Sequence, residues 1–99
     1  MERDYRGLVP ARPRKHAPPR SFIARGTWPR GQLQAGAPVE ARYARVIAQR
    51  LHKVLDGEGI SLREAARRTG VDRQTIARTL AGETVADVAT LAMLSTFIP

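Results

Sequence analysis

One stretch, residues 60–83, constrains the fold more than any other part of the chain. Its start, Ser61-x-x-Glu64, is a capping box, in which a hydroxyl and a carboxylate satisfy backbone amides that a helix start leaves unpaired. Gly70 ends this first helix, because glycine adopts the left-handed conformation of a helix C-terminus at little cost. Asp72 then provides a favourable N-cap for a second helix. The stretch therefore predicts two short helices that meet at a tight glycine turn.

The spacing of small and apolar residues inside this stretch is also specific. Ala66, Gly70 and Ile76 stand four and then six residues apart. We expect Ala66 to be small because the first helix crosses close beneath the second, and Ile76 to hold the inner face of the second helix against the core. Leu80 lies one turn after Ile76 on the same face. Together with the two caps, this arrangement is typical of a helix-turn-helix.

A long amphipathic helix is expected before this unit, at residues 39–56. Pro38 suits its entry, and Glu40 near its start is favourable beside the positive end of the helix dipole. Its apolar stripe, read at steps of three and four residues, comprises Val39, Tyr43, Val46, Ile47, Leu51, Val54 and Leu55. The sequence therefore predicts that this stripe faces the core.

A last helix of about three turns is expected after the unit. Thr84-x-x-Asp87 repeats the capping pattern. The apolar stripe of this helix comprises Val88, Leu91, Leu94 or Ser95, and Ile98. We expect the apolar C-terminus to close the core, because four short helices bury little surface unless every apolar stripe is used. A dimer contact is the alternative.

Residues 1–38 differ from the rest of the chain in composition. They contain six of the seven prolines, and their eight Arg and Lys residues face only Glu2 and Asp4, for a net charge of +6, against +2 for residues 39–99. We expect a disordered or extended basic arm, since no helical or alternating pattern persists. Such an arm can tether phosphates or enter a minor groove. A solvated extension without a specific role is the alternative.

Three large apolar residues, Phe22, Ile23 and Trp28, interrupt this arm. Exposing them together is unfavourable, so we expect them to be covered. A short strand, packing against the helical domain and contact with a partner protein are all compatible with the sequence. Residues 31–38 resemble a linker.

Other classes of function find little support. The chain has no cysteine, and no Ser/His/Asp set, glycine-rich phosphate loop or metal-ligand spacing occurs around His16 or His52. We therefore expect no enzymatic activity, cofactor or metal, and His52 is expected on a helix surface or half-buried. No run approaches the roughly 18 apolar residues of a membrane span, so no membrane association is expected.

With these motifs in place, residues 39–99 resemble the lambda-repressor-like domains of the Cro/Xre helix-turn-helix family. The likeness runs without a gap from Ile60 to Gly82 and includes GVDRQTIARTLAG. It implies an all-α, four-helix domain at 39–99, preceded by the basic arm at 1–38. It also implies that a recognition helix at about 72–81 enters the DNA major groove. Two positions depart from the family pattern. Thr79 stands where the family usually has an apolar residue, and Ala81 stands where it often has asparagine.

The resemblance also implies which residues touch DNA. The candidates for base contacts are Arg73, Gln74, Thr75 and Arg78. The candidates for phosphate contacts are Ser61, Arg63, Arg67 and Arg68. Their chemistry agrees, since glutamine pairs with adenine, arginine pairs with guanine, and the positive end of a helix favours phosphate. Plainer roles are helix capping for Glu64, Asp72 and Thr75, and solvated surface for Arg67 and Arg68.

We therefore expect a bacterial or phage transcriptional regulator that binds double-stranded DNA in the cytoplasm, associated with the nucleoid. A homodimer is compatible with this expectation. The main alternative is a protein-interaction module, such as an antitoxin or accessory factor, that docks a partner through Phe22, Ile23 and Trp28. RNA binding or nonspecific nucleoid binding is a third, given a pI near 11.4.

Overall fold

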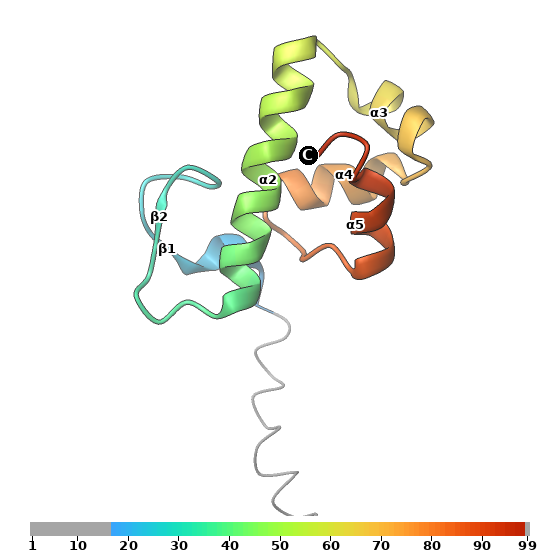
Figure 1. Cartoon of the computed structure of the whole chain (residues 1–99). Coiled ribbons are helices and arrows are strands. Elements are labelled where there is room, and N and C mark those ends of the chain that lie inside the picture. The colour runs from blue at the N-terminus through green and yellow to red at the C-terminus, as the bar shows by residue number, and fades with distance from the viewer. Residues whose placement is uncertain (1–16, 99) are drawn as a thin grey trace, which may run out of the picture.

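The computed structural model describes residues 17–98 (Figure 1). Figure 1 shows a long helix standing between a small hairpin on one side and three short helices on the other. In chain order, the elements of residues 17–98 are a 3₁₀ helix η2 (Pro19–Phe22), strands β1 (Ile23–Arg25) and β2 (Gln32–Leu33), and helices α2 (Val39–Glu58), α3 (Leu62–Thr69), α4 (Arg73–Leu80) and α5 (Val88–Leu94). The expected all-α, four-helix architecture is confirmed for the domain.

Residues 17–38 do not form the extended arm and linker that we expected. β1 and β2 pair antiparallel, with Ile23 opposite Leu33, so part of the presumed linker is a strand. Hydrogen bonds hold this hairpin against α2. Arg45 Nε donates to the Gly31 carbonyl at 2.8 Å and Gln49 Nε2 to the Pro29 carbonyl at 2.9 Å, with a longer bond from Arg45 to the Arg30 carbonyl. Of the alternatives for the apolar residues, a short strand and packing on the domain both occur. The first part of the expected basic arm, residues 1–16, lies outside the described residues.

The first half of α2 buries a different face from the one that the apolar pattern predicted. Ala41, Ala44 and Ala48 are buried there, whereas Val39 is 66% exposed and Tyr43 is 40% exposed. Val46, at 38%, is exposed as well. Alanine side chains allow neighbouring segments to approach the helix closely, and η2 is in contact with α2. No helix within residues 17–98 is both long enough and apolar enough to cross a bilayer.

The core lies where the second half of α2 meets the three short helices. Its buried members are Ile47, Leu51, Leu55, Ala65, Val71, Ile76, Leu94 and Ile98. Every α-helix of the described region contributes a residue, so none of the short helices can be removed without exposing the others' apolar faces. Ile98 and the adjoining Phe97 pack on this cluster, as expected of a C-terminus that closes the core.

The last helix is shorter than predicted and starts elsewhere. Its N-cap is Asp87, whose Oδ1 accepts from the Thr90 amide at 2.7 Å, so α5 begins at Val88 and not at the start of the Thr84-x-x-Asp87 pattern. The helix spans only seven residues. Val88 is 83% exposed and does not belong to the buried stripe, whereas Leu94 is fully buried. Leu91 packs against the core and Ile98 is buried in it, so the predicted stripe is correct except at Val88, the first residue of the helix.

Candidate nucleic-acid interface

The turn between α3 and α4 follows the sequence closely. Ser61 Oγ accepts from the Glu64 amide at 3.1 Å, and Gly70 adopts a φ of 83° after the last turn of α3. Asp72 Oδ2 then accepts from the amides of Gln74 and Thr75, at 3.1 and 3.2 Å. Asp72 is therefore a cap, as expected, and it fixes the residue at which α4 begins.

The inner face of α4 is held by one apolar and one polar residue. Ile76 is fully buried in the core, as expected. Thr79, at the position that is usually apolar in the family, is also buried, with 1% of its surface exposed. Its hydroxyl donates to the Thr75 carbonyl at 2.9 Å, so burial leaves no unpaired polar group. The threonine thus fills the core position without the cost of an orphaned hydroxyl.

The opposite face of α4 presents the predicted base-contacting residues. Gln74 and Arg78 are exposed one turn apart, on the side away from Ile76 and Thr79. Arg73 is exposed and Thr75 is half-buried at the two edges of this face. Three long polar side chains therefore extend from one side of a short helix whose other side is fixed in the core, which is the arrangement that reading base edges requires.

The predicted phosphate-contacting residues lie on or beside α3, but two of them are already paired. Glu64 does not reach back to Ser61 as a capping-box carboxylate would. Instead it accepts hydrogen bonds from Arg67 and from Arg68 Nε, the latter at 2.7 Å. Arg63 and Ser61 are exposed. Arg67 and Arg68 are therefore held along α3 by the Glu64 carboxylate. A phosphate would have to replace this carboxylate or share the two guanidinium groups with it.

This cluster gives Glu64 a pH-dependent role. Hydrogen bonds from Arg67 and then Arg68 lower the pKa of the Glu64 carboxyl from 4.5 to about 2. A depressed pKa in the folded state means that the stabilisation is present above about pH 4.5 and is lost as pH falls toward 2. The Asp87 carboxyl, whose pKa is lowered by the hydrogen bond from the Thr90 amide, acts with the same sign.

We expect Glu64→Gln to flatten the loss of stability below pH 4.5, because the glutamine has no proton to take up in that range. The free energy of unfolding, measured in urea at pH steps from 5 to 2.5, should fall less steeply for the variant than for the wild type. Glu58→Gln, at the exposed end of α2, is the matched control and should follow the wild-type curve. Parallel curves for all three proteins would contradict a native ion pair at Glu64.

The C-terminal end of α4 is held by residues that sequence reasoning did not assign to the site. The Leu80 carbonyl accepts from Trp28 Nε1 at 3.1 Å and lies 3.3 Å from Nε2 of the half-buried His52. α4 ends in a Schellman motif, in which the Glu83 amide donates to the Arg78 carbonyl and Gly82 takes a φ of 74°. Residues 17–38, which we call the N-terminal segment, therefore contact and hold the end of the helix that carries the base-contacting candidates.

A second set of contacts ties the N-terminal segment to the same point. The Arg20 amide donates to the Gly82 carbonyl at 3.0 Å, and the Arg20 guanidinium pairs with Glu83 at 3.2 Å. The only sequence signal for these contacts was Trp28, a large apolar residue in a polar stretch. Local patterns do not relate residues more than 50 positions apart. The side chain of Ala81, which replaces the frequent asparagine, is exposed beside these contacts.

Comparison with known proteins agrees with this architecture. A family model described as helix-turn-helix matches residues 51–99, from the second half of α2 through α5. Through this region the chain belongs to the Cro/C1-type helix-turn-helix family, which confirms the resemblance drawn from the sequence. No curated protein and no solved structure matches the chain.

The family match defines the class of protein, which is a DNA-binding regulator in general. The family is one of DNA-binding domains and not of enzymes. The match excludes the hairpin and the first half of α2, so the segment that braces α4 lies outside the part of the chain that the family describes.

Proposed function

We propose that this protein is a transcriptional regulator that places α4 in the major groove of double-stranded DNA. The observation that carries the proposal is the division of α4 into two faces. Ile76 and Thr79 are buried, while Gln74 and Arg78 are exposed on the other side with Arg73 beside them. An exposed face of this kind on the second helix of a helix-turn-helix is the part that meets base edges.

The side chains on this face suit particular bases. Gln74 can accept from and donate to the N6 and N7 edge of adenine, and Arg78 or Arg73 can donate two hydrogen bonds to O6 and N7 of guanine. Thr75 keeps its side chain near the start of α4, where its methyl group can meet a thymine methyl or its hydroxyl a phosphate. The sequence recognised would therefore combine adenine and guanine positions within one half-site.

Contacts to the DNA backbone would come from the start of α3. The Ser61 hydroxyl accepts from Glu64 and still has its own hydrogen to donate to a phosphate. Arg63 makes no ion pair within residues 17–98, so its guanidinium is available without breaking a contact there. Arg67 and Arg68 would add to this clamp by exchanging part of their pairing with Glu64 for a phosphate.

The alternative function, docking of a partner protein through Phe22, Ile23 and Trp28, has less to support it. All three side chains are partly buried, and the Trp28 indole already donates to the Leu80 carbonyl. A partner would have to displace these contacts or use the remaining surface. Homodimerisation and association with the bacterial nucleoid remain parts of the proposal, and a palindromic recognition sequence would support the former.

Binding-site selection on random DNA tests the proposal directly. We expect one motif to be enriched, and Gln74→Ala to weaken binding to it by about 1–3 kcal/mol while relaxing the preference at one base pair. Gln34→Ala removes another exposed amide, which follows β2 and is not on α4, and should leave affinity unchanged. Failure to enrich any motif, or equal losses for the two variants, would rule out base reading by this helix.

A further inference from the structure

An open groove lies between the hairpin loop and the second half of α2. It occupies ≈ 680 Å³, within the range of about 300–1,000 Å³ that is usual for small-molecule sites. The residues that line it are Thr27, Trp28, Pro29, Arg30, Gln49, His52, Lys53 and Asp56. None of the residues that we assign to DNA contacts borders this groove.

The lining combines an aromatic wall with an excess of positive charge. Trp28 and Pro29 supply flat apolar surface, against which an aromatic ring can stack. Arg30 and Lys53 stand against a single acid, Asp56, and no ion pair joins any of these three within residues 17–98. Two unneutralised cations beside an aromatic wall favour a ligand that is both flat and negatively charged.

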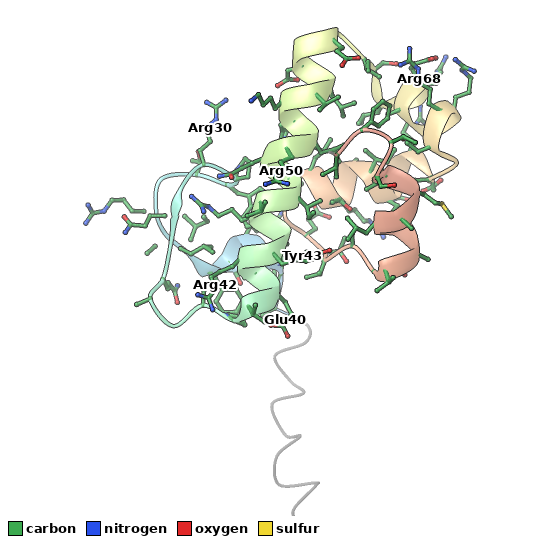
Figure 2. All side chains as sticks on the ribbon, in the orientation of Figure 1. Arg30, Glu40, Arg42, Tyr43, Arg50 and Arg68 are labelled. Carbon is green, nitrogen blue, oxygen red and sulfur yellow. The ribbon has the colours of Figure 1, made fainter. Side chains whose placement is uncertain are left out.

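We propose that this groove binds a small aromatic carboxylate, with the ring against Trp28 and Pro29 and the carboxylate between Arg30 and Lys53. Figure 2 shows Arg30 projecting from the hairpin loop, well separated from Arg42 near the start of α2. Arg30 belongs to the hairpin and Lys53 to α2, so one ligand would bridge the two elements. Guanidinium and ammonium groups both donate to carboxylates, which gives the site its preference for an anion.

The groove is held in shape before any ligand arrives. Gln49 Nε2 donates to the Pro29 carbonyl at 2.9 Å, and Arg45 Nε donates to the Gly31 carbonyl at 2.8 Å. These bonds hold the loop that carries Trp28 and Arg30 against α2. A site whose walls are fixed in advance loses less conformational entropy when it binds.

Two lining residues connect the groove to the end of α4. Trp28 Nε1 donates to the Leu80 carbonyl at 3.1 Å, and His52 Nε2 lies 3.3 Å from the same oxygen. A ligand stacked on Trp28 would therefore alter the environment of the last residue of α4. Any effect of the ligand on DNA affinity rests on the proposed function, whereas binding of the ligand to the groove does not depend on DNA.

Protein NMR tests the proposal without DNA. The chain has a single tryptophan, so one indole N–H resonance reports on Trp28 alone. Titration with naphthalene-2-carboxylate should shift this resonance together with the backbone amides of Leu80 and Ala81. The uncharged naphthalene-2-carboxamide and the non-aromatic cyclohexanecarboxylate should each bind at least about fivefold more weakly, because each lacks one of the two features that the groove recognises.

Matched variants locate the charge preference. Arg30→Gln and Lys53→Gln should each weaken naphthalene-2-carboxylate binding by about fivefold to tenfold. Arg25→Gln on the hairpin and Arg42→Gln on α2 remove exposed arginines that do not line the groove. Both variants should bind naphthalene-2-carboxylate as tightly as the wild type does. No indole shift at millimolar ligand, or equal binding of the carboxamide, would overturn the proposal. Both outcomes would leave the reading of DNA by α4 unaffected.

Discussion

Gly82→Ala is expected to lower the free energy of unfolding by about 2–4 kcal/mol, although it adds only one methyl group. A Cβ at residue 82 would lie 2.5–2.8 Å from three atoms of the Trp28 indole. The ring can move away only by giving up its hydrogen bond to the Leu80 carbonyl. The backbone adds a second cost, because a φ of 74° is unfavourable for alanine.

Gly70→Ala separates these two costs and should lower stability by only about 1 kcal/mol. Its φ of 83° is similar, but nothing lies within 4 Å of an added Cβ. In a Trp28→Ala background, Gly82→Ala should then cost about as much as Gly70→Ala, since only the backbone term remains. Urea unfolding of the five proteins measures all of these differences. A Gly82→Ala cost that is unchanged by Trp28→Ala would show that the indole does not lie against Gly82.

Leu94→Ala is the second substitution with a large expected effect, a loss of about 2–4 kcal/mol in the free energy of unfolding. Leu94 is among the largest fully buried side chains and belongs to the core formed with α2 and α4. Removing its branched end leaves a cavity that the surrounding helices can fill only in part. The remaining helix, two turns long, has little stability without this contact.

Val88→Ala provides the comparison on the same helix. The apolar pattern placed both residues on one stripe, but Val88 is 83% exposed. We therefore expect its replacement to change stability by less than about 0.5 kcal/mol. Thermal and urea unfolding of the two variants should rank them clearly. Similar losses for both would mean that α5 packs with a different face from the one described.

Local signals predicted the α3–α4 unit well. The Ser61 and Asp72 caps and the positive φ of Gly70 are found where the sequence placed them, because each depends on backbone groups within about four residues. Ile76 is likewise buried as expected. The exposed face of α4 follows from these facts, since fixing the helix start and one buried residue fixes the direction of every other side chain.

The sequence predicted less well those features for which a side chain or a helix face has more than one possible partner. The Glu64 carboxylate had two possible uses, and Arg67 and Arg68 take it in place of the Ser61 amide. The first half of α2 carries valines and alanines on different faces. Because valine is more hydrophobic, the sequence predicted that the valine face would be buried. Close packing with η2 favours the small ones instead, so Val39 remains exposed.

The sequence by itself determined the order of the helices, the turn at Gly70 and the helix that carries the candidate base contacts. These features are encoded in short segments whose energies depend on local backbone conformation. Only the tertiary structure decided what the N-terminal segment does. Trp28 contacts the end of α4, and a groove remains beside α2. The contacts of this segment join residues as far apart as Arg20 and Glu83, 63 positions along the chain. Such contacts require the folded arrangement of residues 17–38 against α2 and α4, because no short segment of the chain contains both partners.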